Sequence, residues 1–280
     1  MKELIGVDLG GTKVLTGKVI GDEITELNRK DIPVNGNKMD VLQSIYNTIR
    51  PLISDSIVGI GIGVPSVVDI EKGIVYDVQN IPSWKEVHLK ELMEKEFGLP
   101  VYVNNDANCF AAGEKYYGEA KECQNFVGLI VGTGLAGGII LNNKLYNGAN
   151  CGAGEFGMLP YLDHNFEYYC SGQFFQNKYN SNGFELHKKA KESDQTAIQI
   201  FREFGQHFGK AIQSILYSYD PEMIILGGSI SKAYSLFKES MLEALQSFAY
   251  KKSLETLQIR VSERSDIAIL GAAALFHNAK

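Results

Sequence analysis

The sequence predicts an α/β protein with two domains around a cleft, and three observations lead to this prediction. A strand, a glycine-rich tip and a second strand occur near residue 10, in ELIGVDLGGTKVLTGKVI, and again near residue 134, in NFVGLIVGTGLAGGIIL. Runs typical of strands are interspersed with stretches of helical periodicity over the rest of the chain. The 280 residues suffice for two modest domains, and no linker or low-complexity tract marks a boundary between them.

The first half of the chain opens with three alternating runs, which suit an antiparallel three-stranded start to a sheet. An amphipathic helix is expected next, because Val41, Leu42 and Ile45 recur on one face. A short buried strand then ends in a Gly-Val-Pro turn, and a further strand breaks into a helix at the polar group Asn104 to Asp106. These expected elements span residues 3–10, 13–20, 24–34, 39–54, 56–66 and 100–118.

The second half repeats the strand, tip and strand and then alternates helix and strand. A helical stretch is expected over much of residues 192–219, followed by a strand at 222–231 and a helix at 231–250. A last strand at 257–262 precedes an apolar helix at 266–277.

Composition excludes several classes of function. With a formal net charge of −6, no basic footprint suggests binding to nucleic acid or to an anionic membrane. Asp8 interrupts the first apolar run, so no signal peptide is expected, and no apolar run reaches the roughly 20 residues of a membrane span. The four cysteines form no CxxC pair and are expected to be reduced thiols. We expect a cytoplasmic protein.

The glycine-rich tips indicate phosphate binding. The first is not a Walker A loop, because Lys13 follows Thr12 and a strand, not a helix, comes next. Small residues at a tip let backbone N–H groups approach phosphate oxygens, which a Cβ would hinder. A plain tight hairpin is the alternative for any single turn. A third glycine turn, Leu226 to Ser229, adds weight to the phosphate interpretation.

The motifs together resemble those of the ROK family, which comprises sugar kinases and transcriptional repressors within the actin-like ATPase superfamily. The resemblance covers essentially the whole chain, and it implies two actin-like (ribonuclease H-like) α/β domains around a nucleotide and sugar cleft. The motifs that carry it are Asp8-Leu9-Gly10-Gly11-Thr12-Lys13, Gly63-Val64-Pro65, Asn80 to Trp84, Asn104 to Asn108, Val131-Gly132-Thr133-Gly134, Gly154-Glu155-Phe156-Gly157, Leu226-Gly227-Gly228-Ser229 and Ile269-Leu270-Gly271-Ala272-Ala273.

The resemblance implies the roles of the nucleotide side. ATP phosphates would be held by two backbone turns, and Asp8 would contact Mg²⁺ through water, since Mg²⁺ keeps much of its hydration and prefers carboxylate oxygens. Lys13 would offset phosphate charge, although an exposed strand lysine is an equally good interpretation. The implied nucleotide residues are Asp8, Gly10, Gly11, Thr12, Lys13, Thr133, Gly134, Gly227 and Gly228.

The resemblance also implies the roles of the sugar side. Asp106 corresponds to the general base, which must accept the proton of the attacking hydroxyl. A helix N-cap is the alternative for Asp106, and the two roles are compatible. The residues implied to contact the sugar are Pro65, Asn80, Asn105, Glu155 and Glu167.

The chain departs from the family pattern in one stretch, GEFGMLPYLDHNFEYYCSG. Many members have a histidine where Met158 stands, followed by a cysteine-rich loop that binds zinc with it. That loop is missing here, and His164 and Cys170 lack the spacing to rebuild a four-ligand site locally. Zinc is therefore not expected, and Met158 implies altered sugar recognition. His164 could supply the lost contact or be a plain surface-loop histidine, and Ser66 is a smaller departure in the same pocket.

The sequence thus predicts an ATP- and Mg²⁺-dependent kinase that phosphorylates the primary hydroxyl of a hexose or N-acetylhexosamine. The expected partner is a small sugar, with no nucleic acid and no membrane, in a homodimer. We expect an N-terminal domain of residues 1–113 plus 266–280 and a C-terminal domain of 114–265. The first strand begins at Glu3, which leaves no room before it for the repressors' helix-turn-helix. A non-catalytic sugar-binding regulator and a protein-moving actin-like ATPase are the alternatives.

Overall fold

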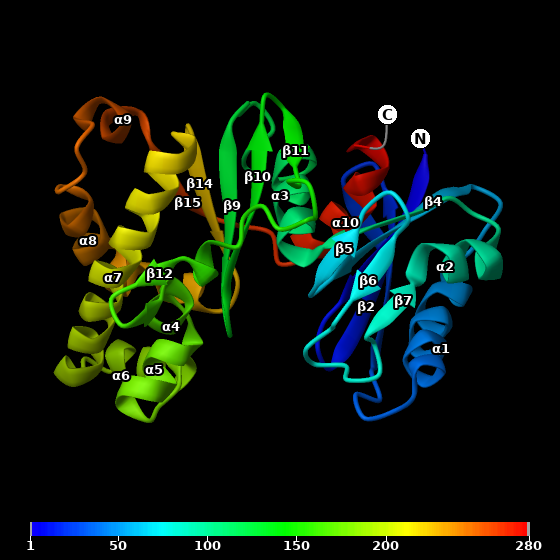
Figure 1. Cartoon of the computed structure of the whole chain (residues 1–280), viewed down its shortest axis with the longest axis horizontal. Coiled ribbons are helices and arrows are strands. Elements are labelled where there is room, and N and C mark those ends of the chain that lie inside the picture. The colour runs from blue at the N-terminus through cyan, green and yellow to red at the C-terminus, as the bar shows by residue number, and fades with distance from the viewer. Residues whose placement is uncertain (1, 279–280) are drawn as a thin grey trace. The chain divides into compact units, whose positions relative to one another are not determined.

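The computed structural model describes residues 2–278 and confirms the α/β class (Figure 1). The chain divides into two compact units. Unit 1 comprises Met1–Glu122, Gly138–Ala153 and Glu263–Lys280, and unit 2 comprises Cys123–Gly137 and Gly154–Ser262. The domain bounds expected from the sequence, 1–113 plus 266–280 and 114–265, stay a prediction.

Unit 1 is built on a five-stranded sheet with the order β3-β2-β1-β4-β8. Strands β1, β2 and β3 are antiparallel, as the alternating runs predict, whereas β4 runs parallel to both β1 and β8. The carboxyl ends of β1, β4 and β8 therefore meet at one edge of the sheet. The strands are β1 (Glu3–Leu9), β2 (Lys13–Ile20), β3 (Glu23–Asp31), β4 (Ile57–Val64) and β8 (Val101–Asn105).

Four helices and a small sheet surround the main sheet of unit 1 within the described residues, and the unit also includes Gly138–Ala153. Helix α1 begins with a capping box formed by Asn37 and Asp40, and its buried face packs into the core with Trp84 and Met93. The helices are α1 (Lys38–Ile49), α2 (Leu89–Phe97), α3 (Asp106–Tyr116) and α10 (Ile267–Asn278), with a 3₁₀ turn η1 (Arg50–Leu52). The small sheet, which the sequence analysis missed, consists of β5 (Val67–Asp69), β6 (Ile74–Tyr76) and β7 (Glu86–His88).

Helix α10 (red in Figure 1) packs closely against α3 and the main sheet of unit 1. Glycines permit this approach: a Cβ at Gly271 would overlap the carbonyl oxygen of Cys109 on α3, and one at Gly61 would overlap that of Ala272. The apolar last helix thus buries Leu270 and Ala273 against the strands that lead to the candidate site.

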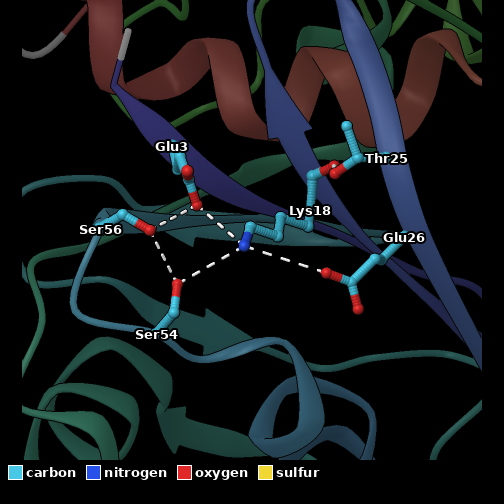
Figure 2. A network of polar contacts seen from close by, with 6 residues as sticks. All are labelled: Glu3, Lys18, Thr25, Glu26, Ser54 and Ser56. Atoms are coloured by element: carbon cyan, nitrogen blue, oxygen red, sulfur yellow. Dashed lines mark hydrogen bonds and ion pairs between the residues drawn. The ribbon is translucent and has the colours of Figure 1, made fainter.

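A polar network joins the strands of the five-stranded sheet of unit 1 at the end where β1 begins (Figure 2). The Lys18 ammonium lies 2.9 Å from a carboxylate oxygen of Glu3, to which Ser56 donates at 2.6 Å, while Ser54 lies 2.8 Å from Ser56. The hydrogen bond from Ser56 and the ammonium of Lys18 hold the pKa of Glu3 below its ordinary value. The network joins β1, β2 and the loop before β4 at the edge away from the strands' carboxyl ends.

Unit 2 contains most of a second five-stranded sheet, with the order β11-β10-β9-β14-β15. Strand β14 is parallel to both β9 and β15. The strands are β9 (Phe126–Val131), β10 (Leu135–Leu141), β11 (Lys144–Tyr146), β14 (Met223–Gly227) and β15 (Gln258–Val261). A two-stranded hairpin, β12 (Pro160–Tyr161) and β13 (His164–Asn165), lies outside this sheet.

The helices of unit 2 surround a buried aromatic core. The 25-residue α7 begins at the cap Asp194 and buries Phe201, Phe204 and Phe208. Phe204 and Phe208 pack with Phe237 of α8, and Phe201 packs with Phe175 of α5. This confirms the long helix expected within 192–219. The helices are α4 (Phe166–Cys170), α5 (Gly172–Tyr179), α6 (Gly183–Lys191), α7 (Gln195–Tyr219), α8 (Tyr234–Leu245) and α9 (Lys251–Thr256), with 3₁₀ turns η2 (Phe156–Met158) and η3 (Ile230–Ala233).

Candidate functional site

The tip between β1 and β2 offers free backbone donors. The Gly10 N–H donates to the carbonyl oxygen of Lys13 at 2.9 Å and closes the turn. Within residues 2–278, the N–H groups of Gly11 and Thr12 donate to no protein acceptor. A Cβ at Gly11 would lie 2.8 Å from Nδ2 of Asn80, so only glycine fits against that side chain. Consecutive free N–H groups at a turn are the kind of donors that can bind an anion.

Asp8 lies at the carboxyl end of β1, beside this tip. It is paired in register with Gly63 on β4 and is half-buried. Burial raises the pKa of Asp8, and the nearby charge of Lys13 opposes that shift. A carboxylate that is desolvated at a sheet edge gains from a bound cation, so the residue fits the Mg²⁺ role implied for it. Lys13 itself is exposed.

Asp106 lies at the carboxyl end of β8, as the first residue of α3. The N-cap of that helix is Asn105, whose side chain accepts the Ala107 N–H at 2.8 Å, and Asp106 Oδ1 lies 2.9 Å from the same N–H. The cap considered for Asp106 is therefore made mainly by Asn105.

Asp8 and Asp106 lie at the same edge of unit 1. The strand β4 separates β1 from β8, and a Cβ at Gly63 would lie 3.8 Å from Cα of Asp106. Beyond the effect of burial, both carboxylates contribute to the raised pKa of the Cys109 thiol beneath them. Open α/β sheets bind ligands outside the carboxyl ends of their strands, which is where these two side chains lie.

The other sugar-side residues of unit 1 are joined to this edge. Asn105 Nδ2 donates to the carbonyl oxygen of Ser66 at 3.3 Å, and Ser66 Oγ donates to the carbonyl oxygen of Tyr76 on β6. Pro65 immediately precedes Ser66. Asn80 is exposed and packs beside Gly11, in a turn fixed by the Trp84 N–H donating to the Ile81 carbonyl oxygen at 2.8 Å. The structure thus brings Pro65, Asn80 and Asn105 to one side of unit 1.

The tip between β9 and β10 in unit 2 has the same design. The Gly132 N–H donates to the carbonyl oxygen of Gly134 at 3.0 Å, and the Gly172 N–H donates to that of Gly132 at 2.7 Å. The N–H groups of Thr133 and Gly134 have no acceptor in the part of the chain that is described. A second pair of free donors therefore occurs at the second tip.

Glu167 braces this second tip. Its Oε2 accepts the Leu135 N–H at 3.1 Å and its Oε1 accepts Nε2 of Gln173 at 2.8 Å, while a Cβ at Gly134 would lie 2.5 Å from Oε2. Both oxygens thus have protein partners within unit 2. Gln173 could not be predicted as a partner of Glu167, because nothing in its local sequence distinguishes it from a solvent-facing glutamine.

Glu155 is placed by a glycine with a positive φ. Gly154 has φ of 95°, and a Cβ there would overlap the carbonyl oxygen of Gly137. The N–H of Gly137 donates to the carbonyl oxygen of Gly154 at 2.8 Å. This contact fixes the start of the 3₁₀ turn η2, and Glu155 extends from it with much of its surface exposed. Partial burial of the carboxylate and the charge of Glu167 raise the pKa of Glu155.

The third glycine turn lies next to the second tip. Gly227 on β14 pairs with Ile130 on β9. Gly228 has φ of 86°, and a Cβ there would overlap the carbonyl oxygen of Val131. Both features require glycine at the end of β14, close to the end of β9. Gly227 and Gly228 lie beside the Thr133–Gly134 turn.

The stretch that departs from the family pattern forms a tight hairpin. Met158 is 51% exposed, and His164 is exposed and stacks on Tyr168 with ring centroids 4.0 Å apart. Across residues 2–278, no group of three or more His, Cys, Asp or Glu side chains is arranged to hold a metal ion. Nor does any described helix combine the length and apolar character needed to cross a bilayer.

The ROK family model matches residues 4–279, nearly the whole chain. The chain belongs to the ROK family. The glucokinase of Thermotoga maritima is 29% identical over 307 residues, which cover 98% of this chain and 96% of that protein. A xylose repressor of Caldicellulosiruptor bescii is 28% identical over 310 residues, covering 97% of this chain and 77% of the repressor.

The fold agrees with the ROK assignment. A ROK family glucokinase from Streptomyces griseus, solved in complex with glucose and AMPPNP, superimposes with a TM-score of 0.83 at 26% identity, covering 98% of both chains. The chain thus has the actin-like ATPase fold of the ROK sugar kinases. Its relatives include both kinases and repressors, so family membership alone does not assign an activity.

Proposed function

We propose that this chain is an ATP- and Mg²⁺-dependent kinase that phosphorylates the primary hydroxyl of a hexose or N-acetylhexosamine. The observation that carries the proposal is that Asp8 and Asp106 both lie at one sheet edge of unit 1. The free N–H groups of Gly11 and Thr12 follow Asp8 at the tip beside this edge. Phosphoryl transfer requires positioning and charge neutralisation rather than covalent chemistry. The glucokinase relatives support the same activity.

On the nucleotide side, each unit supplies one pair of free backbone donors. Gly11 and Thr12 in unit 1, and Thr133 and Gly134 in unit 2, would donate to phosphate oxygens, with Gly227 and Gly228 at the adenosine. The desolvated carboxylate of Asp8 would hold a water-coordinated Mg²⁺. Bound Mg²⁺ neutralises charge on the phosphates, and Lys13 adds to that neutralisation.

On the sugar side, Asp106 would accept the proton of the attacking hydroxyl. Asn105, which caps α3, and Asn80 would orient the sugar from unit 1, and Glu155 would accept a hydroxyl from unit 2. Glu167 would serve the sugar only if its carboxylate is shared with, or released from, Leu135 and Gln173. A cytoplasmic location and a homodimer are further parts of the proposal.

A non-catalytic sugar-binding regulator is the second candidate, and the xylose repressor relative favours it. Exposed Met158 in place of the family's histidine is consistent with such a change of role. A regulator would bind sugar through the same amides, yet it has no use for a proton acceptor at Asp106 or for two tips with free N–H groups.

A substrate panel decides between these functions. The purified chain is incubated with Mg·ATP and each of a set of hexoses and N-acetylhexosamines, and both ADP and the sugar phosphate (by ³¹P NMR) are measured. We expect ADP release in equal amount to one sugar phosphate, lost with EDTA and restored by added Mg²⁺. Sugar binding without turnover would establish the regulator, and ADP release without any sugar would establish an ATPase.

A further inference from the structure

A cluster of buried amides lies directly behind the Asn105–Asp106 junction in unit 1. Asn104 is 3% exposed, and its Oδ1 accepts the backbone N–H of Asn105 at 2.8 Å. This bond holds the last peptide of β8 where the strand turns into α3. The orientation of the Asn104 amide therefore affects where Asp106 begins its helix.

Three further side chains fix the Asn104 amide. Asn108, 1% exposed, donates Nδ2 to Asn104 Oδ1 at 2.9 Å, and the Cys151 thiol approaches the same oxygen at 3.4 Å. Asn104 Nδ2 donates to Asn147 Oδ1 at 3.0 Å, and Asn108 Nδ2 approaches that oxygen at 3.2 Å. Asn147 Oδ1 thus accepts hydrogen bonds from both other asparagines. This side-chain oxygen is the one polar atom of Asn147 that bonds to the cluster in the described structure.

The cluster is costly to build, which suggests a role beyond packing. Asn108 Oδ1 is buried with no hydrogen-bond partner in the described structure. Cys151 is buried, and its backbone has φ of 57°, which residues other than glycine rarely adopt. Such outliers persist where the surrounding structure holds them for function.

Asn147 borders two cavities, and another member of the cluster borders each of them as well. It lines a cavity of about 400 Å³ together with Asn104, and a second of about 610 Å³ together with Cys151. A shortened side chain at 147 would join the space of these cavities to the cluster and give water more access to the amides. The other members of the cluster would then lose their fixed orientation.

We propose that Asn147, through Asn104 and Asn108, is a positioning residue that fixes the Asn105–Asp106 junction for phosphoryl transfer. The inference rests on the proposed kinase function, although the cluster itself does not depend on it. Asn147 touches neither the sugar nor the nucleotide in this account. Its effect is therefore expected on kcat and not on the binding of ATP.

The test compares three variants of the full-length chain. Asn147→Ala removes the shared acceptor, whereas Asn147→Asp keeps an acceptor oxygen in the same place. Asn150→Ala is the matched control, because Asn150 is an exposed asparagine of the same loop outside the cluster. For each variant, kcat, KM for ATP and hydrogen exchange of the segment 101–108 are measured.

We expect Asn147→Ala to lower kcat roughly 10- to 100-fold, with KM for ATP within about twofold. Exchange of the segment 101–108 should accelerate about tenfold or more. Asn147→Asp should restore most of both quantities, and Asn150→Ala should change neither. Unchanged exchange in Asn147→Ala, or an Asp variant no better than the Ala variant, would overturn the inference.

The exchange measurement separates this inference from the proposed function. If the wild type phosphorylates no sugar but Asn147→Ala alone loosens the junction, the kinase proposal fails and the positioning cluster stands. If the wild type is an active kinase and Asn147→Ala matches it in kcat and exchange, the positioning inference fails alone.

Discussion

At the scale of single residues, Glu155 shows how the fold adjusts the chemistry of a side chain. Partial burial and the nearby carboxylate of Glu167 raise the pKa of Glu155, so its charged form is disfavoured in the folded protein. It is nevertheless the charged form that accepts most strongly from a sugar hydroxyl. The residue therefore combines a stability cost with the binding role proposed for it.

Glu155 should make sugar binding sensitive to acid. As the pH falls through its raised pKa, above the ordinary 4.5, Glu155 is protonated and the KM for sugar should rise roughly 10- to 100-fold. Glu155→Gln should show a high KM that no longer varies with pH in this window. The measurement is steady-state kinetics from about pH 5 to about pH 8, which covers the range above the ordinary pKa of a glutamate.

Glu155→Gln should weaken sugar binding but stabilise the folded protein. A carboxyl group with a raised pKa loses stability for the folded state as the pH rises from its unfolded to its folded pKa. Glu155→Gln removes that loss, so thermal unfolding near neutral pH should occur at a higher temperature than in the wild type. A variant that binds sugar normally and unfolds earlier would contradict the role of Glu155.

Residue-level prediction from sequence succeeded where a motif is local. The tips Gly10–Thr12 and Thr133–Gly134 could be found because turn chemistry is written in consecutive residues. Gln173, Asn147 and Cys151 could not be found, because only tertiary structure brings them to Glu167 and Asn104. The implied roles of Asp8, Asp106, Asn105, Asn80 and Pro65 stay predictions until turnover is measured.

At the scale of elements, the hairpin β12–β13 lies between Met158 and Glu167 in the chain and is secured by aromatic side chains. The Tyr161 hydroxyl lies 3.0 Å from Nδ1 of His207 on α7, and the Tyr161 ring stacks on Phe166 with centroids 4.5 Å apart. His207 Nε2 lies 3.6 Å from Glu203, and burial lowers the pKa of His207. The hairpin thus anchors α4, which carries Glu167, to the long helix.

Loss of the Tyr161 hydroxyl should weaken this anchor. Tyr161→Phe is expected to lower the free energy of unfolding by about 1 kcal/mol, which lowers Tm by about 2–4 °C in a protein of this size. Tyr168→Phe is the matched control, because the Tyr168 ring stacks on His164 but its hydroxyl has no partner in the described residues.

Differential scanning calorimetry of the two variants checks this prediction. Equal Tm shifts for Tyr161→Phe and Tyr168→Phe would show that the bond to His207 contributes nothing specific.

Elements with strong periodicity were predicted well, and short ones were not. The antiparallel start β1–β3 and helix α7 match the expected runs, because each repeats its pattern over several turns or pleats. The third strand ends at Asp31 and not at Val34, since Pro33 cannot continue the ladder. The small sheet β5–β7 and helices α4 to α6 were missed, because segments of so few residues are stabilised by their neighbours and not by local pattern.

At the scale of the whole molecule, the sequence predicts one main feature, the glycine-rich tip that occurs twice, between β1 and β2 and between β9 and β10. Each unit carries one tip with two free backbone donors at the end of a strand. Unit 1 adds the two carboxylates at the carboxyl ends of its parallel strands, and unit 2 adds Glu155, Glu167 and the Gly227–Gly228 turn. The kinase proposal requires that both sets act on one pair of substrates.

Asp106 is proposed to accept the proton of the attacking hydroxyl, and Asp106→Asn tests this role. The asparagine keeps the size of the side chain but cannot take the proton. We expect kcat to fall roughly 10²- to 10⁴-fold, with the Kd for sugar within about threefold of the wild type. Asp55→Asn, an exposed aspartate in a turn of unit 1, serves as the control and should change neither quantity.

The most direct measurement is therefore paired: sugar-dependent turnover of Mg·ATP and sugar affinity by calorimetry, for the wild type and Asp106→Asn. Turnover in the wild type that is lost in the variant, with sugar affinity retained, is the predicted result. Undiminished turnover in Asp106→Asn, or sugar binding without turnover in the wild type, would contradict the account.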